Sequence, residues 1–427
     1  MTSGIRRAVM HIDLAEGVPA LATAADGLYI VWWSGIPLGH VDLARDELPI
    51  SAVAAADLMA RTVAPAVLTR LGSNTGPTAL GQSAAPPMLE PRPLQRLRQL
   101  DRARQPLPST STCSVVICTH DRPEALAQCL RSLERQRMRP LEVLVVDNAP
   151  TTEATRRLVE RHAGVRYVRE PRTGLNIARN TGVRCSRGSI IAFTDDDVVL
   201  DEHWVGRLQE AFREGHIAVV TGLVLAAELE TDAQVIFEKH WGFNRGYCRK
   251  DYGPDFFRAT RQRGCPVWEI GAGASMAIRR TALEKVGPFD ERLDVGAAGC
   301  NGDSELWYRI LAAGGTCRYD PDIVAFHRHR REMLALQRQI HQYMRGFVVA
   351  LLIQFERTGE VGNLRHLFLT LPAWYVRLLV KGWRCGWTGR YATIKAEVSG
   401  VWSGLGFYFR NRRLGRRRRR PPEAVAS

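Results

Sequence analysis

Short apolar β-type runs alternate with helical patterns along residues 113–200, and this alternation limits the folds open to the chain. The apolar runs begin near residues 113, 141, 165 and 189, and the helical patterns span 123–137, 153–162 and 177–185. Strands separated by helices favour an α/β fold in which a mostly parallel sheet carries helices on both faces. With 427 residues, 45% of them hydrophobic, the chain is long enough for several parts and a sizeable core.

The run Asp195-Asp196-Asp197 directly follows one of these apolar runs, and Asp147 directly follows another. We expect these side chains at the same carboxyl edge of the sheet, where α/β proteins bind their ligands. Unpaired carboxylates there would repel one another, whereas Mg²⁺ or Mn²⁺ would link them to phosphate oxygens. A solvated acidic turn is the alternative interpretation.

Four short motifs follow one another along this part of the chain. They are Ser114-Val-Val-Ile-Cys-Thr-His-Asp-Arg-Pro123, Val143-Leu-Val-Val-Asp-Asn148, Gly174-Leu-Asn-Ile-Ala-Arg-Asn180 and Phe193-Thr-Asp-Asp-Asp197. Their order resembles that of family 2 glycosyltransferases, and the resemblance runs from about Cys113 to Arg330. It implies the GT-A fold, in which a Rossmann-like nucleotide half is joined to an acceptor half.

The resemblance assigns four residues to the nucleotide of a sugar donor. Thr119 and Asp147 match positions that hold the base, and a carboxylate that accepts from an imide N–H suits a uridine-type base. Arg179 and Asn180 match the element near the diphosphate, whose charge a guanidinium would offset. The alternatives are a helix N-cap for Asp147 and a surface salt bridge for Arg179.

The resemblance also implies a divalent metal, Mn²⁺ or Mg²⁺. In the family's Asp-x-Asp element the first aspartate meets the ribose and the last meets the metal, which makes Asp195 the ribose contact and Asp197 the metal ligand. Asp196 lies between them and braces the turn at the donor site. The closing strand of the family often ends in a histidine that completes the metal site, so His327 is the expected second ligand, with His329 as its neighbour.

The segment Gly302-Asp-Ser-Glu-Leu-Trp-Tyr-Arg309 is similar to the family element whose second residue is the general base of inverting enzymes. This makes Asp303 the expected catalytic base, which takes the proton of the acceptor hydroxyl. The sequence has Gly302 where the family usually has Glu, and Glu305 remains an alternative base. An N-cap role alone is the other interpretation of Asp303.

A glycine-rich stretch resembles the family segment that shapes the donor-sugar and acceptor pocket. Its candidate pocket residues are Trp268, Gly271, Gly273 and Ser275, and the family often has Asn where Ser275 stands. Glycines let the backbone approach a sugar closely. Trp204, Trp241 and Trp268 are candidates for stacking on sugar faces or for ordinary packing.

Outside residues 113–330 the sequence predicts three further parts. Residues 1–71 form a small α+β unit with strands at 9–14, 27–33 and 39–43 and a helix at 51–71, and residues 72–112 form a Pro/Gly/Ser-rich linker with a short helix at 94–104. Residues 331–427 are predicted to be helical and basic. From Arg328 onward there are 20 Lys and Arg against five Asp and Glu, which accounts for the whole net charge of +15.

The basic end mixes aromatic and apolar residues with arginines, including the unbroken run Arg416 to Arg420. Such composition suits an anionic membrane surface, whereas a solvated tail is the alternative for the arginine run. Nine cysteines at irregular spacing do not form a disulfide framework, and the first residues lack the apolar stretch of a signal peptide. We therefore expect a cytoplasmic protein attached peripherally to the inner face of the plasma membrane.

The sequence predicts an inverting, metal-dependent glycosyltransferase that moves a sugar from a UDP- or TDP-linked donor to a hydroxyl of a glycan or lipid-linked acceptor, in cell-envelope or exopolysaccharide synthesis. Transfer to a polyprenyl phosphate is the related alternative. A basic membrane- or nucleic-acid-binding protein with a degenerate nucleotide fold is the non-enzymatic alternative, but its support is confined to the tail, so nucleic acid is not an expected partner. A nucleotidylyltransferase lacks support because no Gly-rich basic loop follows Ile117.

Overall fold

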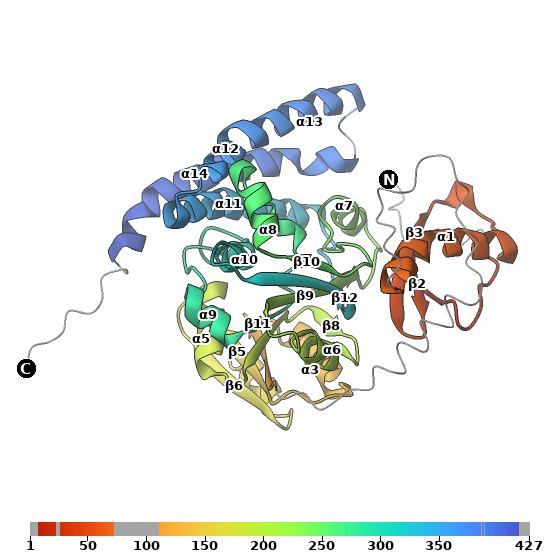
Figure 1. Ribbon diagram of the computed structural model, residues 1–427, viewed down its shortest axis with the longest axis horizontal. Coiled ribbons are helices and arrows are strands. Elements are labelled where there is room, and N and C mark those ends of the chain that lie inside the picture. Colours follow the sequence, from red (N-terminus) through yellow and green to blue (C-terminus); the bar gives the residue numbers. More distant parts are fainter. Residues whose placement is uncertain (1–6, 23–25, 72–110, 386, 388, 418–427) are drawn as a thin grey trace, which may run out of the picture.

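The computed structural model describes residues 7–22, 26–71, 111–385, 387 and 389–417, and its centre is a mixed β-sheet (Figure 1). Within these residues nine strands form the sheet, which runs β10-β12-β9-β11-β7-β4-β5-β6 with β8 paired to β12. The strands are β4 (Cys113–Thr119), β5 (Glu142–Asn148), β6 (Val165–Glu170), β7 (Ile190–Asp195), β8 (Val198–Leu200), β9 (Ile217–Ala226), β10 (Lys250–Tyr252), β11 (Ser275–Arg279) and β12 (Thr316–His327).

The α/β fold class is confirmed, and the predicted parallel order holds for one half of the sheet. Strands β7, β4, β5 and β6 are parallel neighbours. In the other half β11 is antiparallel to both β7 and β9, while β12 is parallel to β9, so the sheet as a whole is mixed.

Helices cover both faces because consecutive residues of the central strands are apolar and their side chains point alternately to the two faces. Val116 of β4 packs in one cluster with Ala178, whereas Val115 and Ile117 pack in another with Leu126. The helices around the sheet are α3 (Pro123–Glu134), α4 (Ala154–Val159), α5 (Leu175–Cys185), α6 (Trp204–Ala211), α7 (Asp232–Trp241), α8 (Pro254–Thr260), α9 (Arg280–Val286) and α10 (Gly302–Ala312).

The strand register brings the predicted site residues to one edge. Thr119 pairs with Asp147 across β4 and β5, and Cys118 pairs with Asp195 across β4 and β7. On the other side of the aspartates, Val198 of β8 pairs with His327, the last residue of β12. The expected common carboxyl edge is therefore present.

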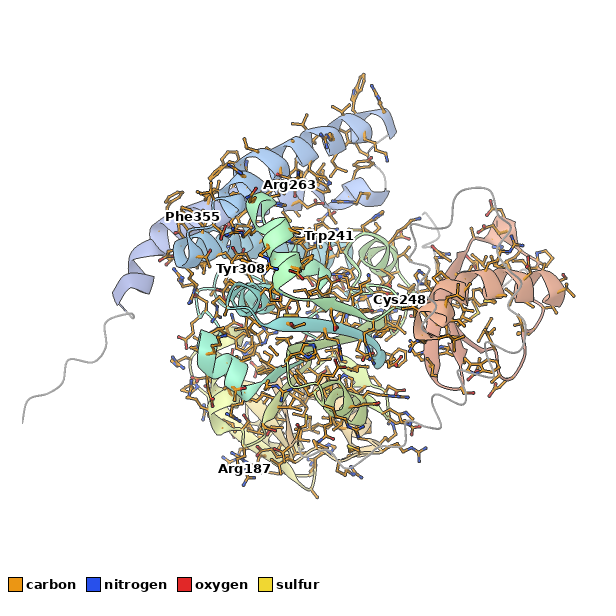
Figure 2. All side chains as sticks on the ribbon, viewed as in Figure 1. Arg187, Trp241, Cys248, Arg263, Tyr308 and Phe355 are labelled. Carbon is orange, nitrogen blue, oxygen red and sulfur yellow. The ribbon has the colours of Figure 1, made fainter. Side chains whose placement is uncertain are left out.

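The N-terminal segment contains β1 (Ala8–Asp13), β2 (Gly27–Trp33), β3 (Ile36–Leu43) and α1 (Ala52–Arg70), close to the predicted elements. It packs against the main sheet, because Arg70 forms an ion pair of 2.6 Å with Asp322 and Thr69 contacts Cys248 at the junction (Figure 2). Of the described helices, α1 alone is long and apolar enough to cross a membrane by length and composition, which is weak evidence for a span. Several of its side chains, including Met59 and Val63, are buried in the core.

A helical layer at the C-terminal end covers the side of the sheet at the top of Figure 1. It consists of α11 (Met333–Thr358), α12 (Gly362–Arg365), a π-helical turn (His366–Thr370), α13 (Leu371–Cys385) and α14 (Ile394–Arg417). The predicted linker helix at 94–104 and the end of the arginine run lie outside the described residues, and the division of the chain into domains stays a prediction.

Two glycines let α14 lie close against α11. A Cβ atom on Gly404 would lie 2.7 Å from the Arg345 carbonyl oxygen and 2.8 Å from the Val348 Cβ, and one on Gly400 would meet the His341 carbonyl oxygen at 2.5 Å. The small residues are therefore required by the spacing between the two helices.

We expect Gly404→Ala to destabilise the protein. The added methyl group should lower the free energy of unfolding by about 1–3 kcal/mol through overpacking, which exceeds the roughly 1 kcal/mol gained when alanine replaces glycine in a helix. Thermal unfolding should show a melting temperature lowered by several degrees. Gly215→Ala is the matched control, since a Cβ there meets no atom within 4 Å. Equal melting temperatures for the two variants would contradict close packing of α11 and α14.

Candidate active site

A cleft of about 1370 Å³ opens at the carboxyl edge of the sheet. Its floor holds the three aspartates and His327, and its walls come from α7, from the loop 268–274 and from the C-terminal helices. Pockets for one drug-sized ligand measure roughly 300–1,000 Å³, so this cleft has room for two substrates side by side. Trp241 and Trp268 line it, whereas Trp204 is buried in the core.

The aspartates are held by a threonine and an arginine. Thr119 donates from Oγ1 to Asp196 at 2.7 Å, and Arg122 donates to Asp196 at 2.6 Å and to Asp197 at 2.8 Å. Burial raises the pKa of Asp195 to about 7 and that of Asp196 to about 6. Burial opposes ionisation of Asp197 as well, but His327 and Arg122 hold its pKa below the ordinary value. The run is therefore not a solvated acidic turn.

A chain of hydrogen bonds leads from His327 to a half-buried acid, Glu238. His327 Nδ1 lies 2.9 Å from His329 Nδ1, and His329 Nε2 lies 2.8 Å from Glu238 Oε2. A carboxylate accepts, so His329 carries its proton on Nε2, and its Nδ1 accepts from His327 when the ring is neutral. Burial lowers the pKa of His327 to about 4, which keeps this ring neutral. The chain therefore leaves the lone pair of His327 Nε2 free.

This lone pair faces Asp197, whose Oδ1 lies 3.5 Å from His327 Nε2. Two electron-pair donors so close to one another fit a cation between them. Within the described residues no three or more His, Cys, Asp or Glu side chains form a complete metal site. The pair fits a divalent ion that takes its remaining ligands from phosphate oxygens and water. The predicted ligands, Asp197 and His327, are brought together.

Asp303 lines the cleft, and Glu305 does not. Asp303 is the second residue of α10, not its N-cap, and accepts from the Gly273 and Ser304 N–H groups at 2.9 and 2.7 Å. A Cβ on Gly273 would lie 2.7 Å from Asp303 Oδ2, so the glycine makes room for the carboxylate. Glu305 is fully buried and binds Arg309 at 2.8 Å, which directs it away from the cleft.

Arg179 lines the cleft beside Asp303 but its main partner is an acid that the sequence did not indicate. It donates to Asp294 at 2.6 Å, with both side chains buried, so the surface salt bridge considered for it is wrong. Burial raises the pKa of Asp294 to about 6, against the opposing charge of Arg179. Asp294 has a positive φ of 74°, and a loop residue of this kind has no periodic pattern by which to find it.

Three predicted site residues lie behind the cleft wall. The Asn180 side chain donates to the carbonyl oxygen of Phe289 and accepts from its N–H group. Ser275 Oγ accepts from Trp204 at 2.9 Å, so neither side chain is directed at the cleft. Asp147 is fully buried and accepts from Tyr167, but its Oδ1 has no hydrogen-bond partner among the described residues. It is not an N-cap, because α4 begins at Ala154. The direct contacts expected of Asn180 and Ser275 find no support here.

The remaining predicted residues line the cleft, together with residues that sequence reasoning missed. Thr119, Asp195, Gly271 and Trp268 are at its surface as expected. The missed residues come from the Thr-His-Asp-Arg motif, from α7, from the loops before α10 and α11, and from the C-terminal helices, and they are Arg122, Glu238, Asp294, Arg330, Tyr343 and Trp374. Arg122 belongs to the motif Ser114–Pro123, so its positive charge close to the aspartates could have been predicted from the sequence.

Comparison with known proteins agrees with the family resemblance found in the sequence. Residues 114–287 match the glycosyl transferase family 2 model. The chain is 32% identical over 229 residues to the succinoglycan biosynthesis protein ExoM of Rhizobium meliloti, covering 48% of this chain and 63% of that protein. It is 26% identical over 234 residues to the pre-mycofactocin glycosyltransferase of Mycobacterium tuberculosis, covering 53% and 44%.

The match thus spans less than two thirds of the length of these curated relatives. Among solved structures, a mannosyltransferase from Pyrobaculum calidifontis in complex with GDP-Man and Mn²⁺ is similar at 18% identity, with a TM-score of 0.45 over 73% of this chain and 94% of that one.

We expect the hydrogen-bond chain to control the histidine tautomer and the affinity for Mn²⁺. Long-range ¹H–¹⁵N spectra of the metal-free protein, assigned with a His327→Gln variant, should show His327 protonated on Nδ1 and bare on Nε2. In Glu238→Ala the tautomer is no longer fixed, and Mn²⁺ affinity should fall about 10–100-fold. The control is Glu230→Ala, which removes an exposed carboxylate that pairs with Arg331. A proton on His327 Nε2 would contradict the assignment.

Proposed function

We propose that this protein is an inverting, metal-dependent glycosyltransferase that moves a sugar from a nucleotide-sugar donor of the UDP or TDP type to a hydroxyl of a glycan or lipid-linked acceptor. The observation that carries the proposal is that Asp197 and His327, 3.5 Å apart, share one large cleft with the acid Asp303. The similarity to proteins of succinoglycan and O-antigen biosynthesis supports a role in polysaccharide synthesis.

In this mechanism the acceptor oxygen attacks the anomeric carbon as the bond from that carbon to the diphosphate breaks. Asp303 takes the proton from the acceptor hydroxyl, and its two backbone N–H bonds hold it in position. The nucleoside diphosphate leaves with the electron pair of the broken bond. A bound Mn²⁺ or Mg²⁺ would supply Lewis-acid stabilisation of that leaving group at Asp197 and His327.

Donor binding is supported by cations placed beside the aspartates. Arg122 and Arg179 line the cleft, and Arg330 lies 4.0 Å from Asp197. Each can offset diphosphate charge. Asp195 and Asp196, which line the cleft, remain the proposed donor contacts.

Calorimetry with UDP and other nucleoside diphosphates should detect binding that requires Mn²⁺ or Mg²⁺ and disappears with a chelator. Asp197→Ala should abolish the metal-dependent part of nucleotide binding, because it removes one of the two side chains proposed to bind the metal. The matched control is Asp201→Ala, which removes a partly exposed acid after β8. Binding to no nucleotide by the unmodified chain would reject the proposed donor site.

Variants of α10 distinguish the base from the buried acid. Asp303→Asn should reduce transfer by about 10²–10⁴-fold, because a positioned base is lost, while nucleotide binding persists. Glu305→Gln breaks the buried pair with Arg309 and should lower the free energy of unfolding by about 3–5 kcal/mol. Transfer assays and thermal unfolding on both variants would measure this contrast. Full transfer by Asp303→Asn would exclude it as the base.

Transfer to a polyprenyl phosphate is the second candidate, favoured by the exposed cations Lys239 and Arg338 on the cleft wall formed by α7 and α11. A phosphate acceptor is already anionic, so activity that survives Asp303→Asn and requires polyprenyl phosphate would support it. We also propose a cytoplasmic location, which agrees with the free thiols of the eight cysteines from Cys113 to Cys317.

A further inference from the structure

Helix α13 has an apolar stripe on each of two opposite faces. The inner stripe, Leu371, Tyr375, Leu378 and Gly382, is buried or half-buried, and its buried residues pack in one cluster with α11 and α14. The outer stripe consists of Leu369, in the turn that leads into the helix, and Val376, Val380 and Trp383, at intervals of seven, four and three residues. These side chains are exposed, Leu369 by 67% and Trp383 by 76%. An amphipathic helix of a soluble domain needs only the first stripe.

A basic stripe runs beside the outer apolar one. Arg377, Lys381 and Arg384 each follow an outer apolar residue by one position, which places them about 100° round the helix, and all three are exposed. The sequence from 361 to 396 contains six Lys and Arg and no Asp or Glu. Further exposed apolar side chains, Phe368, Trp387 and Trp402, come from the same helical layer. Apolar and aromatic side chains flanked by cations suit the boundary between lipid headgroups and acyl chains.

The position of α13 in the fold agrees with contact to a flat surface. It forms the outermost layer of the molecule, on the side of α11 away from the sheet, and its side chains project outward there (Figures 1 and 2). The helix also reaches the cleft, because Leu371 and Trp374 at its start form part of the cleft wall, next to His366 and Thr370 of the preceding turn. One helix therefore carries both an exposed apolar face and a wall of the candidate active site.

We propose that the outer face of α13 lies in the interface of an anionic lipid bilayer. There it holds the mouth of the cleft at the membrane surface, where a lipid-linked acceptor is presented. The acceptor part rests on the proposed glycosyl transfer, whereas the contact with lipid does not. The outer stripe enters the headgroup region, and the basic stripe binds the anionic headgroups beside it.

Flotation of the full chain with vesicles, without any nucleotide, tests the lipid contact. The chain should bind to vesicles of equal parts phosphatidylglycerol and phosphatidylcholine. It should bind far more weakly to vesicles of pure phosphatidylcholine. The variant Leu369→Ser/Val380→Ser/Trp383→Ser should bind at least tenfold more weakly, and Arg377→Glu/Lys381→Glu should lose most of the preference for anionic lipid. Leu141→Ser, also an exposed apolar residue but on the sheet domain, should bind like the unmodified chain.

All these variants keep Arg416 to Arg420, so their loss of binding isolates α13 from the arginine run. Bromine-labelled lipid should quench tryptophan fluorescence less in Trp383→Phe than in the unmodified chain. Vesicle binding by the triple variant equal to that of the unmodified chain would overturn the proposal. So would an unmodified chain that is a dimer without lipid and becomes a monomer in the triple variant, because the outer stripe would then be a dimer interface. Stronger binding to duplex DNA than to vesicles would also overturn it. Retained metal-dependent UDP binding in the triple variant shows that it is folded. Transfer to a soluble acceptor, measured separately, tests the proposed function without lipid.

Discussion

The clustering of three carboxylates at the end of β7 is the constraint on which the rest of the site depends. Backbone register alone brings Asp195 beside β4 and Asp197 beside the end of β12. Buried carboxylates are costly unless opposite charge is supplied, and Arg122 supplies part of it by bonding to both Asp196 and Asp197. Burial raises the pKa of Asp195 and Asp196, whereas the pKa of Asp197 is lowered because His327 and Arg330 lie beside it in addition to Arg122.

The same electrostatic requirement accounts for the surroundings of the cluster. His327 remains neutral because it is buried, and the bond through His329 to Glu238 turns its free nitrogen toward Asp197. On the opposite side, Arg179 is occupied by Asp294, which leaves Asp303 bonded only to backbone N–H groups in the described contacts. Arg179 also lies close enough to both Asp195 and Asp303 for its charge to act on each, so this cation links the donor side to the base side.

Much of the α/β half could be predicted because its periodic patterns are local. Apolar runs located β4, β5 and β7 to within two residues at their ends, and motif matching located Asp197, Asp303 and His327 in one cleft. The structure directs Asn180 and Ser275 away from the cleft, because a polar residue in a motif can bond to a distant part of the chain, as Asn180 bonds to the backbone of Phe289. Sequence separation conceals such partners, and Asp294 was missed for the same reason.

The C-terminal region shows the limit of composition as a guide. Its charge and aromatic content predicted an attachment segment, but composition carries no information on which face of a helix is already occupied. Tyr375 bonds to Glu397, and Arg390 is bonded to the same carboxylate, which fixes the inner face of α13 against the start of α14. Once that face is occupied, the outer stripe is left without a protein partner among the described residues. Helix α13 carries both a part of the cleft wall and the exposed apolar face. The orientation of the cleft is therefore coupled to the surface that this face binds.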